Sequence, residues 1–487
     1  MFDTTDFNPW DDADRMAGMA FEMYENGQMD MALTQLEEAI EINPNNSAWL
    51  FNKGLTLDAM ERYLEAIESF EQALELSPDD PEILNSLAVD YTRTGQYDRA
   101  LRTFEHIQTV DPSFEPAYCN RIIAYTELDQ HDKAEEMFYL AQQINPDCPI
   151  CFYNIGNSLF SRQRYKRAIW CWQRTAQLEP THPQIHFRIA QAYWADGDAE
   201  NAQKYFLAEL RVNPGDTDAI LEFGIFLLKS DRIEPAKEKF NRCLELSPDF
   251  APAKFYLGEI AMKQGNCEAA HQWFSAAQQN DRRLPGPAFR LAQLAVAAGD
   301  TKQAVKYLKD EYALSISDPE VLLTMGQMFM ELGELDPATE CFLRVVDEDN
   351  QNAQAFECLG RTLAQRKDYL GALQFFEHAR RLGDHSAELA ADSARINLSM
   401  YRICAAARTL ELGLADHPDN AALRQLARKV HWMHLSRTAY RKFRSVPLFK
   451  RILQFMDDYR FRIRRVINSK RPSPSFPVTL NPRKIRK

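Results

Sequence analysis

The sequence predicts an all-α protein, an α-solenoid of stacked helix–turn–helix units with a basic helical extension at its C-terminus. Three observations predict this fold. A proline recurs every 34 residues, an alanine recurs with the same period, and a glycine or alanine recurs at a fixed distance before that alanine. A repeat of this length is typical of helical arrays. Most of the 487 residues are therefore expected to form one elongated domain rather than several globular ones.

The recurrent prolines mark the ends of the repeats, in phrases such as EINPNN and ELSPDD. They are Pro44, Pro78, Pro112, Pro146, Pro180, Pro214 and Pro248, and the same step leads on to Pro418. The four intervening steps fall on other residues, yet the register continues without insertion or deletion. The period therefore governs the chain from about residue 13 to residue 420.

The recurrent alanine lies in the second predicted helix of each repeat. It occurs at Ala32, Ala66, Ala100, Ala134, Ala168, Ala202, Ala236, Ala270, Ala304, Ala338, Ala372 and Ala406. Four residues later comes a bulky apolar residue, such as Phe70 or Trp172, which shares the same helix face. The alanine must be small because two helices cross closely there. Small residues such as Gly54 and Gly156 serve the same crossing from the first helix.

Residues 13–420 resemble twelve tetratricopeptide repeats, and the resemblance covers more than four-fifths of the chain. It implies a right-handed α-solenoid, a superhelix in which the first helix of each repeat lines a concave groove and the second helix forms the outer wall. One hairpin cannot bury its apolar face alone, so stacked neighbours supply the core. Residues 1–12 are expected to cap the first repeat or to present a short motif to another protein. Residues 421–436 are expected to form a helix that caps the last repeat.

The groove implied by the resemblance would bind an extended peptide. In this family the concave side carries the second, fifth, sixth, ninth, twelfth and thirteenth positions of a repeat. The candidate peptide-binding residues at these positions are Asn52, Asn120, Tyr153, Asn154, Asn157, Phe187, Arg188, Gln191, Trp194, Phe255, Tyr256 and Arg290. Asparagine amides both donate to and accept from a peptide backbone, and aromatic rings supply apolar contact. A plainer interpretation is that several of these side chains pack between neighbouring repeats.

Several function classes are not predicted. The lysine and asparagine pattern with which some members of the family clamp the carboxyl terminus of a chaperone is not present. A mixed and slightly acidic groove would repel the phosphates of a nucleic acid. No phosphate-binding glycine loop, zincin helix or nucleophile elbow is found. The 67 residues that follow the array are too few for a glycosyltransferase domain. We expect no enzyme activity and no small-molecule substrate.

The C-terminal part of the chain differs from the array in charge. Residues 421–487 carry 19 Lys or Arg and two acids, a net charge of +17, whereas residues 1–420 carry −30. Within residues 437–470 an apolar helix face is flanked by the basic residues Arg460, Arg462, Arg464, Arg465 and Lys470. Residues 471–487 are predicted to be disordered. Four interpretations of the basic segment stay open: it caps the solenoid, lies on an anionic membrane, binds another protein or the acidic array itself, or binds nucleic acid.

The nine cysteines are scattered without a disulfide framework, which favours a reduced, cytoplasmic location, peripheral at a membrane if the tail binds one. Cys148 and Cys151 form a CxxC at the start of a first helix, where a thiol of lowered pKa or half of a zinc site could stand. Because no second CxxC exists, a structural role is expected. His431 and His434 have no further ligands in view. No metal and no cofactor are predicted.

Together these observations predict a non-enzymatic scaffold or adaptor. Its groove would capture an extended segment of one or more partner proteins, and its basic tail would localise it or add a second contact. Two rival functions remain. One is a regulatory subunit that positions a catalytic partner in a polymer-synthesis or secretion complex. The other is a nucleic-acid- or membrane-associated factor that acts through the tail.

Overall fold

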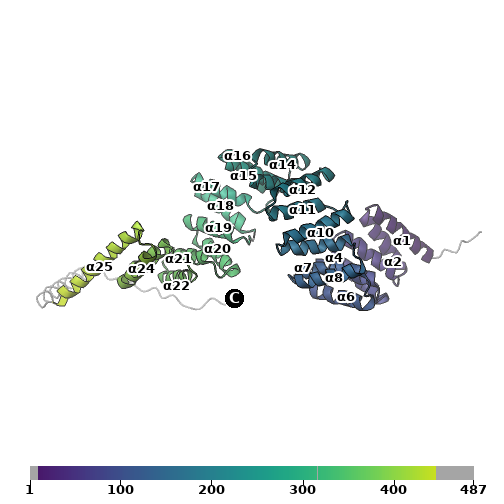
Figure 1. The fold of residues 1–487 in the computed structure, drawn as a ribbon, viewed down its shortest axis with the longest axis horizontal. Coiled ribbons are helices and arrows are strands. Elements are labelled where there is room, and N and C mark those ends of the chain that lie inside the picture. The colour runs from purple at the N-terminus through teal and green to yellow at the C-terminus, as the bar shows by residue number, and fades with distance from the viewer. Residues whose placement is uncertain (1–8, 315, 446–487) are drawn as a thin grey trace, which may run out of the picture. The chain divides into compact units, whose positions relative to one another are not determined.

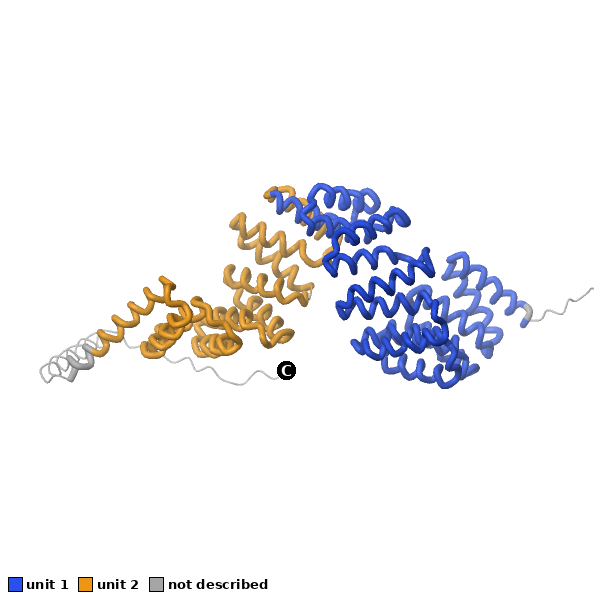
Figure 2. Tube along the Cα trace, in the orientation of Figure 1, with its two compact units in different colours: residues 1–264 blue, residues 265–487 orange. Residues whose placement is uncertain are grey.

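The computed structural model describes residues 9–314 and 316–445. Over these residues the chain forms twenty-five α-helices and no strand (Figure 1). It divides into two compact units, residues 1–264 and 265–487, each of which is described by itself (Figure 2). In each unit, helices that follow one another in the chain pack together. The predicted all-α solenoid is confirmed. None of the described helices is both long enough and apolar enough to span a bilayer.

The first unit contains the helices α1 (Pro9–Glu25), α2 (Met29–Ile42), α3 (Ser47–Ala59), α4 (Tyr63–Leu76), α5 (Pro81–Arg93), α6 (Tyr97–Val110), α7 (Glu115–Glu127), α8 (His131–Ile144), α9 (Pro149–Ser161), α10 (Tyr165–Leu178), α11 (Ile185–Ala195), α12 (Ala199–Val212), α13 (Thr217–Lys229), α14 (Ile233–Leu246) and α15 (Ala251–Lys263). Residues 9–12, expected to belong to a cap that precedes the first repeat, are instead the first residues of α1.

The second unit contains α16 (Cys267–Asn280), α17 (Pro287–Ala297), α18 (Thr301–Tyr312), α19 (Pro319–Glu331), α20 (Leu335–Glu348), α21 (Ala353–Gln365), α22 (Tyr369–Arg381), α23 (Ala387–Ser399), α24 (Ile403–Asp416) and α25 (Ala421–Ser445). Helix α25 continues through residue 436, where the sequence suggested a boundary between a capping helix and a basic segment.

The close helix crossing predicted from the recurrent alanine is present in every repeat. All twelve alanines, from Ala32 to Ala406, have no exposed surface. The bulky residue four positions later is also buried in eleven repeats, for example Phe70, Trp172 and Phe342. In five of the hairpins that have glycine at the helix crossing, this ring lies directly over the glycine of the first helix, as Phe70 does over Gly54. Ring and small residue therefore form the core of each hairpin.

One repeat reverses this arrangement. Its first helix, α7, has Ile122 at the crossing instead of glycine or alanine, and Ile122 is fully buried. The corresponding bulky residue, Phe138 on α8, remains half-buried and packs edge-on against Phe152 of α9, with ring centroids 5.5 Å apart. Because Ile122 fills the space over the alanine, Phe138 turns towards the next repeat.

Two first helices begin two residues later in their repeat than the others. These are α11 and α17, whose N-cap residues Gln184 and Gly286 have φ angles of 53° and 109° and give no side-chain cap. A buried carboxylate from the second helix of the same repeat accepts the uncapped N–H groups instead. Glu209 accepts from Phe187 N at 3.2 Å, and Glu311 accepts from Gly286 N at 2.6 Å and Phe289 N at 3.0 Å.

A buried acidic group lies between the second and third repeats. Asp90 on α5 is 1% exposed, pairs with Arg93 at 3.3 Å and has one oxygen, Oδ2, without a hydrogen-bond partner. Arg93 also contacts Asp58 on α3. Burial, followed by the negative charge of Asp58, raises the pKa of the Asp90 carboxyl well above its usual value.

Replacing Asp90 with asparagine should stabilise the first unit at neutral pH. The pKa of Asp90 is higher in the folded chain than in the unfolded chain. The free energy of unfolding therefore falls as the pH rises from about 4, the unfolded pKa, and stops falling above the folded pKa. The free energy of unfolding of the wild type should fall between pH 5 and pH 8, and Asp90→Asn should be more stable at pH 8 by about 1 kcal/mol. Urea unfolding at several pH values measures both. An equal change in the exposed control Asp14→Asn would contradict the assignment.

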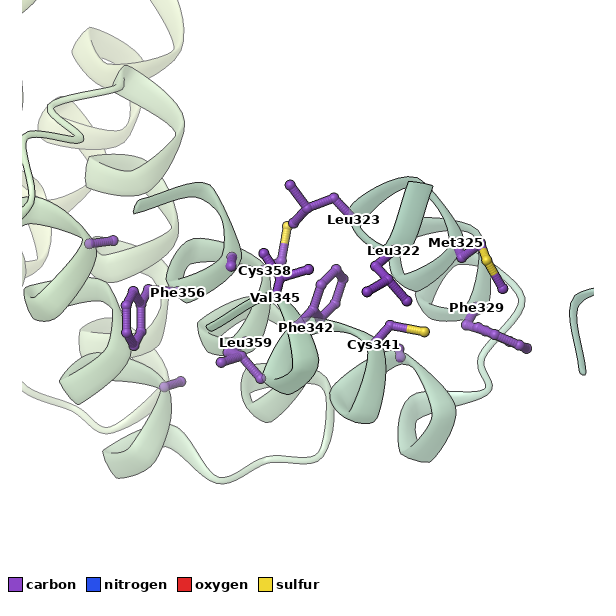
Figure 3. Close-up of a cluster of buried hydrophobic side chains, with 14 of the residues drawn as sticks. Leu322, Leu323, Met325, Phe329, Cys341, Phe342, Val345, Phe356, Cys358 and Leu359 are labelled. Atoms are coloured by element: carbon purple, nitrogen blue, oxygen red, sulfur yellow. The ribbon is translucent and has the colours of Figure 1, made fainter. Parts of the chain in front are cut away.

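The main core of the second unit is formed by α17 to α23. Figure 3 shows Phe342 of α20 beside Leu322 of α19 and Val345 of its own helix. Further along, Leu423 and Val430 anchor α25 on α24. A cavity of about 760 Å³ opens between these two helices, lined among others by Arg428, His431 and His434. Arg428, which occupies the small-residue position of a further repeat, lines this cavity.

Candidate peptide-binding surface

The predicted groove residues of the first unit lie on its first helices. Asn52 is on α3, Asn120 on α7, Tyr153, Asn154 and Asn157 on α9, Phe187, Arg188, Gln191 and Trp194 on α11, and Phe255 and Tyr256 on α15. Arg290 is on α17 and belongs to the second unit, where it donates to Gln293 at 2.9 Å. The predicted peptide-binding residues are therefore divided between the two units.

Two of the predicted asparagines hold neighbouring repeats together. Asn154 is 5% exposed, and its amide donates to the backbone oxygen of Cys119 at 2.9 Å. Asn120 donates to Asn85 Oδ1, 3.1 Å away on α5. The prediction that Asn154 meets a bound peptide is therefore wrong, because burial and this hydrogen bond remove it from the surface. Asn52 and Asn157 remain half-buried.

Several predicted aromatic residues also serve packing. Phe187 is 7% exposed and lies against Phe206, so it is not available to a peptide. Trp194 meets Phe226 of the next repeat edge-on at 5.6 Å, and Tyr256 stacks on Phe240 at 5.3 Å. The plainer interpretation, packing between neighbouring repeats, applies to Trp194 and Tyr256, whereas Phe187 packs within its own repeat. A repeat position alone does not reveal these contacts.

A smaller set remains accessible around Arg188. The Nε of Arg188 is buried, and within the described residues it has no hydrogen-bond partner. Tyr153, Gln191 and Phe255 are half-buried on the same set of first helices. Glu222 of α13, which the sequence analysis did not select, has the same repeat position as Arg188, and burial raises the pKa of its carboxyl. Counting 34 residues from Arg188 would have found it.

The basic tail residues Arg460, Arg462, Arg464, Arg465 and Lys470 lie outside the described residues, as do residues 1–8 of the expected N-terminal cap. The four interpretations of the tail therefore stay predictions.

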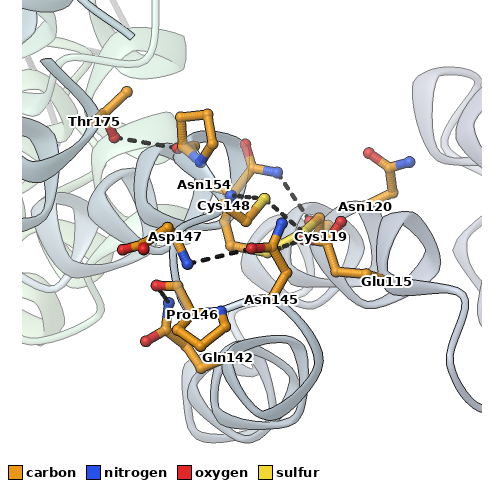
Figure 4. Close-up of a disulfide and its surroundings, with 12 residues drawn as sticks. Glu115, Cys119, Asn120, Gln142, Asn145, Pro146, Asp147, Cys148, Asn154 and Thr175 are labelled. Atoms are coloured by element: carbon orange, nitrogen blue, oxygen red, sulfur yellow. Dashed lines mark hydrogen bonds between the residues drawn. A yellow bond between two sulfur atoms is a disulfide. The ribbon is translucent and has the colours of Figure 1, made fainter. Parts of the chain in front are cut away.

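The structure corrects the view of the cysteines as unpaired. Cys119 and Cys151 form a disulfide with a Cα–Cα distance of 5.0 Å, and the other seven cysteines are free (Figure 4). The CxxC motif thus has a partner on α7. Aligning the repeats could have indicated it, because both cysteines lie near the start of consecutive first helices.

The stacked hairpins define a helical-repeat protein, and comparison with known proteins gives the family. Models described as tetratricopeptide repeat match residues 23–81, 57–120, 183–216, 221–285 and 323–387, and a model described as TPR repeat matches residues 156–197. The chain belongs to the tetratricopeptide repeat superfamily. This membership indicates a protein-interaction scaffold.

Individual relatives are distant. The chain is 23% identical over 268 residues to the protein CTR9 homolog of Arabidopsis thaliana, covering 46% of this chain and 24% of that protein. It is 23% identical over 184 residues to anaphase-promoting complex subunit 3 of Schizosaccharomyces pombe, covering 38% and 28%. It is 22% identical over 233 residues to the TPR repeat-containing protein YpiA of Bacillus subtilis, covering 47% and 55%. The matches thus span about a quarter to about half of these relatives.

Among solved structures, the crystal structure of the APC/C hetero-tetramer Cut9–Hcn1 matches with a TM-score of 0.37 and 14% identity, covering 86% of this chain and 96% of that chain. The crystal structure of yeast Tom70 matches with a TM-score of 0.35 and 14% identity, covering 91% and 99%.

Proposed function

We propose that this chain is a non-enzymatic scaffold whose first unit captures an extended segment of a partner protein across α9, α11, α13 and α15, with Arg188 as the central contact. Superfamily membership supports the scaffold role. The choice of surface rests on Arg188, whose Nε is buried but unpaired within the described residues.

An unpaired buried donor is costly to a fold and is seldom kept without a use. The guanidinium of arginine offers five N–H groups in a planar fork, which suits a carboxylate or two successive carbonyl oxygens. A partner carboxylate or backbone carbonyl that reached the guanidinium of Arg188 would form a charge-assisted hydrogen bond in a partly desolvated place. The partner segment is therefore expected to be extended and to carry an acidic residue at its centre.

The surroundings of Arg188 support an extended ligand. Tyr153 precedes it by one repeat, and its ring lies 4.4 Å from that of His182. Phe255 and Glu222 follow in later repeats. Two aromatic groups thus flank two charged groups along the direction in which the repeats stack, so an extended peptide could meet apolar contacts on either side of a polar centre.

A peptide selection on the full chain tests the proposal. Random peptides displayed on phage are selected against the wild type, and the affinity of the selected peptides is measured by fluorescence anisotropy. Acidic peptides should be enriched, and Arg188→Ala should weaken their binding at least tenfold, because a charge-assisted hydrogen bond contributes about 1.5–3 kcal/mol. Arg188→Lys should restore binding only in part, since it keeps the charge but loses the fork.

The matched control is Arg102→Ala, which removes an exposed arginine from the second helix α6. It lowers the net charge equally but leaves the proposed surface intact, so its affinity should equal that of the wild type. Selected peptides that bind Arg188→Ala as tightly as the wild type would show that the groove around Arg188 is not the binding surface.

A further inference from the structure

Four potential metal ligands gather between the fourth and fifth repeats. They are Glu115 and Cys119 of α7, Cys148 at the N-cap of α9, and Cys151 within α9. Their ligand atoms all lie within 4.8 Å of one another, and the three cysteines are buried. No other group of this kind occurs among the described residues. Figure 4 shows the sulfur atoms converging between the two helices, with Glu115 beside them.

Local structure explains why these side chains meet. Glu115 and Cys119 are four residues apart on α7 and so share one helix face. Cys148 and Cys151 are three residues apart across the first turn of α9 and also point the same way. Helices α7 and α9 are the first helices of successive repeats and contact each other directly. The hydrogen bond from Asn154 to the Cys119 oxygen fixes the two helices next to the cluster.

The distances are those of a small tetrahedral site. A zinc–sulfur distance of about 2.3 Å implies sulfur–sulfur separations of about 3.8 Å in a tetrahedron. The Sγ atoms of Cys119 and Cys148 are 3.7 Å apart. Glu115 Oε1 lies 2.7 Å from Cys119 Sγ and 3.2 Å from Cys151 Sγ. To complete the tetrahedron, the Cys119–Cys151 disulfide must open, and Glu115 Oε1 must draw back from Cys119 Sγ to the roughly 3.5 Å that the zinc bond lengths imply.

The contacts of Glu115 fit the reduced cluster better than the oxidised one. A disulfide sulfur carries no proton, so a carboxylate oxygen beside it has nothing to accept. When Cys119 and Cys151 are reduced, each thiol can donate to Glu115, and a divalent cation between them would neutralise carboxylate and thiolates together. Thiolate and carboxylate ligands are both used by zinc.

The start of α9 favours negative charge at the cluster. Cys148 is its N-cap, and the backbone N–H of Cys151 donates to Cys148 Sγ at 3.4 Å. The N-terminal end of a helix stabilises anions. Zinc binds cysteines as thiolates, so metal binding releases their protons.

We propose that Glu115, Cys119, Cys148 and Cys151 bind one Zn²⁺ ion when the three cysteines are reduced, and that the Cys119–Cys151 disulfide is the alternative, metal-free state. A cellular dithiol supplies two electrons and two protons to the disulfide and becomes a disulfide itself. Zinc binding then releases the three thiol protons. The ion links two consecutive repeats close to Asn120 and Asn154, and the same two sulfurs cannot hold a disulfide and a zinc ion at once.

Cobalt(II) reports directly on such a site. The full chain, reduced with a phosphine and freed of metal, is titrated with Co²⁺ and then with Zn²⁺. We expect one equivalent of Co²⁺ to give thiolate-to-cobalt charge-transfer bands and the intense visible bands of a tetrahedral complex, and one equivalent of Zn²⁺ to remove them. Chain oxidised at Cys119 and Cys151, as verified by peptide mass mapping, should give neither band.

Variants separate this site from the other thiols. Cys148→Ser and Cys119→Ser should weaken Co²⁺ binding at least tenfold, and Glu115→Gln should shift the visible bands because one ligand oxygen is exchanged. The matched control is Cys243→Ser, a buried free cysteine on α14 outside the cluster, whose spectrum should equal that of the wild type. Circular dichroism confirms that each variant is folded. A folded, reduced wild type without charge-transfer bands would overturn the proposal, as would equal loss of the bands in Cys243→Ser.

Discussion

Replacing Gly156 with alanine should destabilise the repeat formed by α9 and α10 more than any other single-methyl change in the first unit. An added Cβ would lie 2.6 Å from Trp172 Cδ1 and 2.9 Å from Cε2. Trp172 cannot easily move, because it is 1% exposed and its indole nitrogen donates to the backbone oxygen of Tyr153 at 3.1 Å. Overpacking typically costs about 1–3 kcal/mol, and losing the indole hydrogen bond costs about 1–3 kcal/mol more.

Against these losses stands the higher helix propensity of alanine, about 1 kcal/mol. We expect a net loss of about 3 kcal/mol, which is about a hundredfold in the opening equilibrium of this hairpin. Hydrogen exchange followed by mass spectrometry measures it in peptides from α9 and α10. Local exchange is the suitable readout because repeat arrays do not always unfold in one step.

Gly18→Ala is the matched control for this prediction. Gly18 is an exposed residue within α1, and an added Cβ meets no atom within 4 Å. The same methyl group should therefore stabilise α1 by about 0.5–1 kcal/mol. Unchanged exchange in α9 and α10 of Gly156→Ala would mean that Trp172 has room to shift, and that the crossing is looser than the structure indicates.

Replacing Glu311 with alanine should destabilise the second unit by about 3 kcal/mol, because two buried N–H groups lose a charged acceptor. Those groups belong to Gly286 and Phe289, where α17 begins without a side-chain cap. Glu311 itself has no exposed surface. Urea unfolding of the full chain and hydrogen exchange in α17 and α18 both measure the effect.

Glu311→Gln should lie between alanine and the wild type, since the amide keeps one acceptor oxygen but places an NH₂ group against the second donor. The exposed Asp310 on the same helix provides the control, and Asp310→Ala should change stability by less than about 0.5 kcal/mol. Equal losses in Glu311→Ala and Asp310→Ala would show that α17 does not depend on the buried carboxylate.

The fold was readable from the sequence because its strongest signal is a period rather than a propensity. A residue that must be small recurs every 34 positions, and all twelve alanines found this way are completely buried. The exceptions were readable in principle as well. Ile122 in the small-residue position predicts a displaced Phe138. Glu209 and Glu311 occupy the same position of their repeats. In every other repeat that position holds an uncharged residue no larger than isoleucine, so the two glutamates mark the two late helix starts.

The candidate binding surface was less predictable, because a repeat position fixes the helix face but not the neighbour that a side chain meets. Asn154 and Phe187 have groove positions, yet the Cys119 carbonyl and the Phe206 ring occupy them. The Phe206 ring belongs to the second helix of the same repeat, whereas reaching the Cys119 carbonyl depends on the rotation of one repeat against the next. The disulfide partner of Cys151 was missed for the same reason, since Cys119 comes near it only after two repeats have stacked.

The buried glutamates have a consequence for how this chain could be rearranged by recombination. Each glutamate and the helix start that it serves lie within the same repeat: Glu209 with α11, and Glu311 with α17. A whole repeat can therefore be copied, moved or deleted as a cassette without separating an acceptor from its donors. An exchange point in the turn between the two helices of such a repeat would do the opposite. It would place a buried carboxylate beside a helix that starts at the usual position and offers it no free N–H groups, or leave a late-starting helix without its acceptor. Viable exchange points should therefore fall between repeats.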